Sequence, residues 1–360
     1  MPNPSTARRG RARHRSPSPV GFTRFVAAAA VVLVVAVAWR SGVLGSLIGS
    51  KGTSSSASSP SPGRGAVTSA PATPSHPSHP PSTAAATPGP INTSFPGLTT
   101  FRGNATRDYY GAGPVPKHPT ILWRYPRSGA LCSSSNNLGV TKVWCGTGWT
   151  GQPNVIPHKD GTIEVREGAY DGHYHFLNGL TGEQLRPDLV TGDLAKGSAT
   201  SDSQGYPLYY GGSRDNLLRV VALDRATPTV LWSYDSRSNP HLVWNDDWDA
   251  APLEVGDYLM EGSENSWFYI WKLNRRYDAN GLVQVAPQLM MEVPGYDSQL
   301  FASIHDQDVS IENSVAYDAA RGVVYFANSG GLVQGWDVRD VLAGHPYVPG
   351  ADVYDGRVFR

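Results

Sequence analysis

Four segments of the sequence repeat one pattern: a β-rich run, a tight polar turn, a second β-rich run and a closing Asp or Asn. The turns contain pairs such as Asp171-Gly172, Asp215-Asn216 and Gly330-Gly331, which favour hairpins because these residue types tolerate a positive φ. The closing residues lie 46, 50 and 63 positions apart: Asn178, Asp224, Asn274 and Asp337. Hairpins that recur at this period are typical of four-stranded units in a stacked or radial array.

The segment 212–232 resembles the repeat of the pyrroloquinoline-quinone (PQQ) type propellers, the quinoprotein alcohol dehydrogenase-like family. It reads Gly-Ser-x-Asp-Asn, then Val-Val-Ala-Leu-Asp224 and Val-Leu-Trp232. Phe101-Arg102-Gly103-Asn104 and Leu122-Trp123 are similar to the opening strand of that family. The resemblance covers about residues 98–360. It departs from the family at Asn178, which replaces the closing Asp and is followed by no Trp.

Residues 98–360 are therefore predicted to be an all-β propeller of four-stranded blades. At roughly 50 residues per unit they supply about five blades. The resembling family usually builds seven or eight, so we expect an incomplete ring or a short, irregular one.

The first 107 residues contain eleven Lys or Arg and no Asp or Glu, whereas residues 108–360 carry 19 basic and 30 acidic residues. Residues 1–24 form a basic tail, and an apolar run extends from Phe25 to Ile48. By the positive-inside rule the tail stays cytoplasmic and the rest is translocated. We interpret residues 25–48 as a transmembrane signal anchor. The alternative is a signal peptide cleaved after Ala36-Val37-Ala38.

Residues 49–97 are rich in Ser, Pro, Thr and Ala and cannot bury a core, so they are predicted to be a disordered linker. The expected location is the cell membrane, with a single pass, a cytoplasmic N-terminus and an extracytoplasmic propeller. The folded part is acidic, which argues against a nucleic-acid partner.

The two cysteines of the chain are Cys132 and Cys145, and both lie in the part predicted to be exported. An even pair in that environment indicates a disulfide, with two free thiols or a metal site as alternatives. A loop of this size would gain on the order of 3 kcal/mol from the crosslink.

Loops, rather than strands, are free to bind ligands in a propeller. The richest candidates combine aromatic rings with carboxylates and amides: Trp149, Trp244, Asp246, Asp247, Glu264, Asn265, Glu312 and Asn313. The acids of segment 244–249 could take calcium, or could be solvated in a loop that connects two blades. For each candidate, packing between blades or capping of a turn is the simpler interpretation.

The resemblance gives meaning to two Glu-Asn pairs, 264–265 and 312–313. Quinoprotein dehydrogenases hold calcium with a Glu and an Asn beside the quinone and use an Asp as base, here Asp306 or Asp308. This chain lacks the adjacent cysteines that many members stack on the quinone. The alternating histidines of His173-Tyr174-His175 could form half a metal site, but no third ligand is evident.

The sequence favours a membrane-tethered extracytoplasmic propeller that acts as a binding or scaffold module at the cell envelope. Its partner would be an envelope protein or a glycan, and we assign no catalytic residue, cofactor or metal. The alternative is a dehydrogenase of alcohols or sugars that depends on PQQ and calcium. A glycan-binding propeller, suggested by the Trp-rich loops, is a third possibility.

Overall fold

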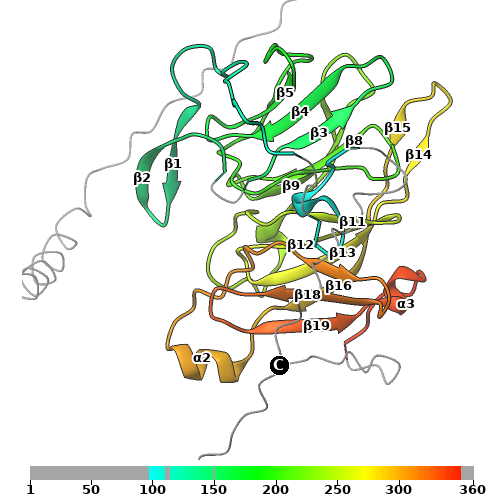
Figure 1. The fold of residues 1–360 in the computed structure, drawn as a ribbon. Helices are drawn as coiled ribbons and strands as arrows, with labels where there is room; N and C mark the ends of the chain where they lie inside the picture. The colour runs from blue at the N-terminus through cyan, green and yellow to red at the C-terminus, as the bar shows by residue number, and fades with distance from the viewer. Residues whose placement is uncertain (1–96, 110–113, 149–150, 350–360) are drawn as a thin grey trace, which may run out of the picture. The chain divides into compact units, whose positions relative to one another are not determined.

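The structure, a computed structural model, describes residues 97–109, 114–148 and 151–349 (Figure 1). Three antiparallel sheets have four strands and follow one another along the chain. They are β3 (Asn154–Pro157), β4 (Ile163–Gly168), β5 (His173–Asn178) and β6 (Leu189–Val190); β7 (Thr200–Ser201), β8 (Leu208–Gly212), β9 (Leu217–Ala222) and β10 (Thr229–Asp235); and β11 (Leu253–Val255), β12 (Tyr258–Gly262), β13 (Trp267–Lys272) and β16 (Gln288–Pro294).

The fourth sheet has three strands in the described residues: β17 (Ala316–Asp318), β18 (Val323–Ala327) and β19 (Val333–Asp337). Two hairpins stand outside the four sheets: β1 (Cys132–Asn137) with β2 (Val140–Cys145), and β14 (Arg276–Tyr277) with β15 (Val283–Gln284). The helical segments are short: η1 (Phe101–Gly103), η2 (Ser236–Ser238), α2 (Ser298–Ile304) and α3 (Arg339–Leu342).

The recurring four-stranded antiparallel sheet confirms the predicted β-propeller fold. About five blades were expected, and the described residues contain four sheets. The difference arises because the stretch before β3 contributes the separate hairpin β1–β2, while residues 350–360 lie outside the described residues. The predicted tail, anchor and linker, apart from Gly97, also lie outside them. Within the described ranges, no helix has the length and apolarity to cross a membrane.

Consecutive sheets pack face to face because neighbouring strand residues point to opposite sides. Tyr209 of β8 packs with Tyr174 of the first sheet, whereas the next residue, Tyr210, packs with Leu259 of the third. Met260 in turn faces the fourth sheet. The second and third sheets therefore bury both faces, which explains why their central strands β8 and β12 are buried along their whole length.

The turn between the second and third strands has the same geometry in all four sheets. Its last residue has a positive φ: 78° at Gly172, 73° at Asn216, 70° at Ser266 and 95° at Gly331. The amide two positions earlier donates to the loop that precedes the first strand of the same sheet, at 2.9 to 3.0 Å: Tyr170 N to Gly146 O, Arg214 N to Leu194 O, Glu264 N to Asp247 O and Ser329 N to Ser310 O. We call this end of the sheets the turn end.

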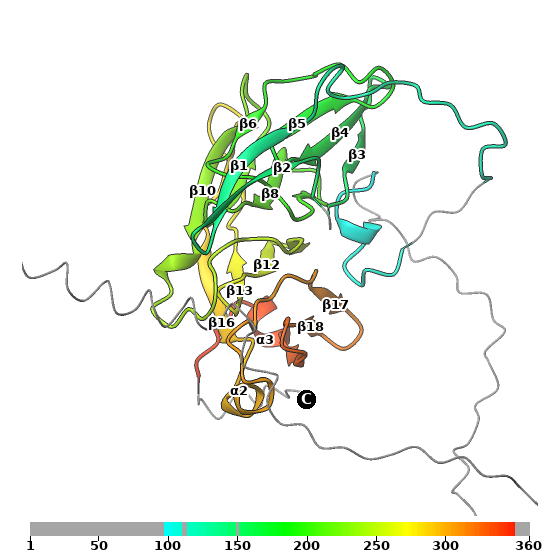
Figure 2. The ribbon, with the colours of Figure 1, turned by 90° about the vertical axis from the view of Figure 1, so that its left-hand side faces the viewer.

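Residues 97–109, which we call the crossing segment, contact all four sheets. Leu98 forms a bridge with Val155 of β3, and Thr99 O accepts a hydrogen bond from Ser201 N of β7. Tyr317 N of β17 donates to Ala105 O. Figure 2 shows this segment, in cyan, between β3 and β17. The prediction of an opening strand at 101–104 is wrong. Phe101–Gly103 form the helical turn η1, and the crossing segment pairs with a strand only at Leu98.

Arg107 connects the crossing segment to the third and fourth sheets. Its side chain is buried, and burial lowers the pKa of Arg107 to about 9, an effect that the nearby Glu261 opposes. The guanidinium therefore stays charged at neutral pH. It donates five hydrogen bonds, of 2.6 to 3.3 Å: to Val315 O, Thr100 Oγ1, Phe101 O, Ala251 O and Pro252 O.

The predicted disulfide between Cys132 and Cys145 is confirmed. The two residues are directly opposite in the β1–β2 ladder, so the bond closes the base of this hairpin. Ser135 Oγ donates to Asp193 Oδ2 at 2.9 Å, and Asn137 Oδ1 accepts from Asn245 at 3.2 Å. The hairpin is thus fixed covalently at its base and by side-chain contacts further along.

Candidate functional site

Five charged side chains meet at the turn end of the second and third sheets: Lys196, Arg214, Asp247, Asp249 and Glu264. We call them the charged cluster. One oxygen from each of the three carboxylates lies within 4.8 Å of the others, and all three residues are buried. Lys196 Nζ contacts Asp249 Oδ2 and lies 3.3 Å from Glu264 Oε1. Arg214 Nε donates to Asp247 Oδ2 at 2.6 Å.

The local chain geometry explains this convergence. Arg214 and Glu264 occupy the same position in their respective turns, and Lys196, Asp247 and Asp249 come from the loops that these turns bind through their amides. Because this hydrogen bond from turn to loop repeats in each sheet, side chains that are far apart in the sequence lie together at the turn end. The result is a rigid group of side chains built on turns that the strands hold in place.

Burial and mutual repulsion control the protonation of the charged cluster. Burial, followed by the charge of Glu264, raises the pKa of Asp247. Burial, followed by the contact with Asp249, raises the pKa of Glu264. Burial opposes the charge on Lys196, but Asp249 and Glu264 outweigh it and raise the pKa of the ammonium. Three acids thus face two bases, and one proton held among the acids would neutralise the group.

Among the predicted site residues, the structure brings Asp247 and Glu264 together. Asn245 lies beside them, because its Nδ2 is 2.5 Å from Glu264 Oε2 and also donates to the β1–β2 hairpin. Glu312 belongs to the same end of the molecule. Burial, followed by the charge of Glu264, raises the pKa of Glu312, and its Oε1 accepts from Ser310 Oγ at 2.9 Å.

The two predicted Asn ligands serve turns. Asn265 Nδ2 donates to Ser236 O at 2.9 Å and to Tyr269 Oη at 2.7 Å, and its Oδ1 accepts from Trp267 N. Asn313 Oδ1 accepts from Ala327 N at 3.2 Å. The side-chain oxygen of each Asn thus accepts a backbone amide of the fold.

The remaining candidates lie elsewhere. Trp244 lines a separate pocket of about 710 Å³ beside α2, with Leu242, Val243, Phe301, His305, Asp306 and Gln307. Asp246 lies next to Asp247 in sequence but outside the charged cluster, and its carbonyl accepts from Ser236 Oγ. Trp149 is outside the described residues.

Sequence reasoning missed Lys196, Arg214 and Asp249 as members of one group. Aligning the repeats on their turns would have placed Arg214 and Glu264, which have opposite charges, at one level. Lys196 has no comparable signal, because it lies in a short polar loop and its partners are 53 and 68 positions away.

The two histidines of β5 are held by carboxylates. His175 Nε2 lies 3.2 Å from Asp171 and Nδ1 lies 3.1 Å from Asp188. Burial opposes a charge on this ring, but the two carboxylates outweigh it and raise the pKa of His175 to about 9. His173 Nδ1 is 3.4 Å from Asp171 Oδ1. Because both nitrogens of His175 face carboxylates, this environment favours the imidazolium, which has no free nitrogen to bind a metal.

No known protein family and no curated protein matches the sequence. Among solved structures, the computationally designed protein Ika4 is similar at 15% identity, over 52% of this chain and 89% of that one, with a TM-score of 0.34. BamB from Moraxella catarrhalis is 12% identical, over 61% of this chain and 62% of that one, with a TM-score of 0.33. The RRP9 WD40 repeats are 13% identical, over 54% and 49%, also at 0.33.

These similarities are too weak to bear on function. The propeller assignment rests on the repeated sheets of this chain, and its role has to be argued from its own side chains.

Proposed function

We propose that the chain is a membrane-tethered, extracytoplasmic propeller of the PQQ-like type that acts as a binding or scaffold module at the cell envelope. The basic tail and the apolar run from Phe25 to Ile48 support the tether. The repeat that ends at Asp224 and continues to Trp232 supports membership of the PQQ-like group. The partner we propose is an envelope protein or a glycan.

The observation that carries the binding role is the β1–β2 hairpin. Its base is closed by the disulfide, and it exposes apolar side chains: Leu138, Val140 and Val143 are 62%, 55% and 70% exposed. A braced element that keeps apolar groups in water is suited to a partner surface, because burying them gains about 25 cal/mol per Å².

Site-specific photo-crosslinking in intact cells tests this role. A photoreactive residue at Val143 should give a discrete crosslinked product in the envelope. The matched control is Leu180, which is 59% exposed but follows β5 at the opposite end of the first sheet. The absence of a product at Val143, or an equal product at Leu180, would contradict the proposal.

The dehydrogenase alternative has its own assay. The full chain is reconstituted with PQQ and calcium, and dye reduction is followed with a panel of alcohols and aldoses. We expect no turnover, because the side-chain oxygens of both Asn residues already accept backbone amides, Asn265 from Trp267 and Asn313 from Ala327. Turnover that requires both additions would replace the binding role with catalysis.

The tether is tested by fractionation and external protease. The protein should sediment with membranes, and protease added to intact cells should remove the propeller. A propeller that is recovered in the cytosol and protected until lysis would refute the proposed location.

A further inference from the structure

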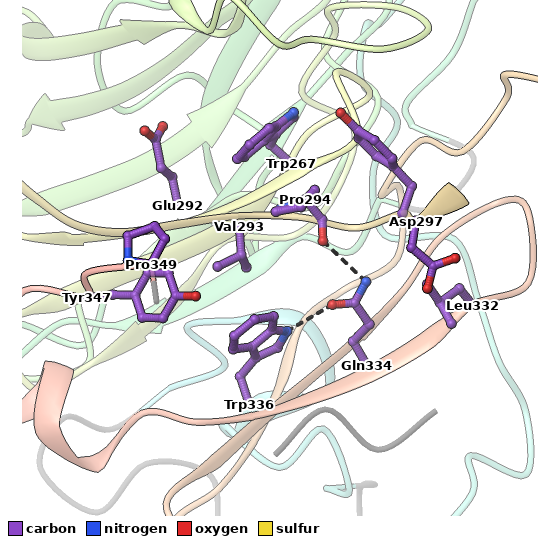
Figure 3. A pocket seen from close by; sticks show the side chains of 11 residues that line it. Trp267, Glu292, Val293, Pro294, Asp297, Leu332, Gln334, Trp336, Tyr347 and Pro349 are labelled. Carbon is purple, nitrogen blue, oxygen red and sulfur yellow. Dashed lines mark hydrogen bonds between the residues drawn. The ribbon is translucent and has the colours of Figure 1, made fainter. Parts of the chain in front are cut away.

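A pocket of about 450 Å³ lies where β16 of the third sheet meets β19 of the fourth (Figure 3). Glu292 comes from β16, Trp267 from β13, and Trp336 from β19; Tyr296 and Tyr347 come from the segments after β16 and α3. In Figure 3, Trp267 and Glu292 lie on one side of β16 and Trp336 on the other, so the pocket wraps around this strand. Its volume falls in the range of small-molecule sites.

Aromatic rings form the walls of this pocket in two perpendicular pairs. The centroids of Trp267 and Tyr296 are 6.4 Å apart with an interplanar angle of 83°. Those of Trp336 and Tyr347 are 5.8 Å apart, also at 83°. Perpendicular rings form corners, and the faces of such rings carry the negative part of the aromatic quadrupole, which attracts cations.

The polar groups of the pocket also favour a cation as the ligand. Trp267 Nε1 and Tyr296 Oη both donate to His241 O, at 3.0 and 3.1 Å. Trp336 Nε1 donates to Gln334 Oε1 at 2.9 Å. These three donors are therefore already engaged. The exposed carboxylate of Glu292 remains available as an acceptor.

The charge of the residues that line the pocket also favours a cation. It includes two acids, Glu292 and Asp297, and neither Lys nor Arg among the described residues that form it. An anion would be repelled, and a sugar would need donors as well as acceptors from the wall. We propose that this pocket is a binding site for an organic cation, an alkylammonium group whose charge faces Glu292 and whose alkyl body packs on the rings. The site is independent of the partner surface proposed above.

Isothermal titration of the full chain in mild detergent tests the proposal with choline and its neutral isostere 3,3-dimethylbutan-1-ol. Choline should bind saturably, and the isostere should bind at least about tenfold more weakly, since it lacks the charge that the rings and the carboxylate attract. Equal binding of the two, saturable binding of methyl glucoside without choline binding, or no saturable heat from choline would overturn the proposal.

Two variants separate the pocket from a general charge effect. Glu292→Gln keeps the shape of an exposed side chain and should weaken choline binding roughly three- to tenfold, as expected for the loss of one partly solvated ion pair. Glu183→Gln removes an exposed charge of the same kind outside the pocket and should leave choline binding unchanged. Unchanged binding in Glu292→Gln, or an equal loss in both variants, would overturn the assignment.

Discussion

Replacing Arg107 with Met should cost the protein a large part of its stability. The substitution keeps most of the side-chain volume but removes all five hydrogen bonds that the guanidinium donates. Four of the acceptors are backbone carbonyls, in the crossing segment and in the loops directly before the third and fourth sheets. Each loses the guanidinium as a donor, and only Pro252 O keeps a second one, Thr200 Oγ1. The variant therefore disconnects these parts without creating a large cavity.

The magnitude follows from the other three carbonyls. A buried acceptor left without its donor costs about 1–3 kcal/mol, so three of them give at least about 3 kcal/mol. Removing the guanidinium also removes its own desolvation cost, which keeps the total well below the sum of five charged hydrogen bonds. At roughly 2–4 °C per kcal/mol for a domain of this size, the melting temperature should fall by about 10 °C.

Urea unfolding of the full chain, followed by tryptophan fluorescence, measures the effect. Arg321→Met is the matched control, because Arg321 is 73% exposed and pairs only with Asp318 at the surface. It should change the stability by less than about 0.5 kcal/mol. Arg107→Lys keeps the charge with three donors instead of five and should fall between the two. Equal midpoints for Arg107→Met and Arg321→Met would refute the connecting role.

Three further outcomes are expected. Replacing both Cys132 and Cys145 by Ser should speed amide exchange in the β1–β2 hairpin, measured by mass spectrometry, because the base of the hairpin is then no longer closed covalently; unchanged exchange would contradict this. The folded-state pKa of His175 is raised to about 9, so its contribution, about 3 kcal/mol at most, is complete below pH 6.5 and lost as the pH rises through 9. The native protein should thus be less stable at pH 10 than at pH 6, and His175→Gln should remove most of that difference in urea midpoint; an unchanged difference would count against the imidazolium. Lys196→Met should lower the free energy of unfolding by about 3–5 kcal/mol at pH 8, because Asp249 and Glu264 lose the cation that they contact. The loss should be smaller at pH 5, where bound protons neutralise these carboxylates instead. Equal losses in urea midpoint at the two pH values would argue against the ion pairs.

The strands and turns of this fold could be predicted because their signals are local. The run Val323–Ala327 is β18 in full, and the tip at 277–281 lies in the hairpin of β14 and β15. Alternation and turn residues depend on neighbours a few positions away, so the sequence displays them directly.

The crossing segment could not be predicted, because its partners are remote. Arg107 looks like one more basic residue of the N-terminal part, and the carbonyl of Val315 that it binds has no sequence signature. In the candidate site, the hydrogen bond from Glu264 N to Asp247 O brings these two residues together, and both were chosen from the sequence as loop residues. Lys196 was missed, because a lysine in a polar loop is usually solvated and its burial here depends on two sheets packing together.

The crossing segment also constrains the order in which the chain can become native. Arg107 is made early, yet one of its acceptors lies 208 positions later. Until the chain before β17 has been synthesised and has folded, the Arg107 guanidinium lacks one of its acceptors, Val315 O. The crossing segment therefore cannot take its native position between the sheets before then. Contacts of such long range make folding slow, because the intervening chain must be ordered before they form. The earliest part of the propeller therefore becomes fixed only after the chain that leads into the fourth sheet has formed.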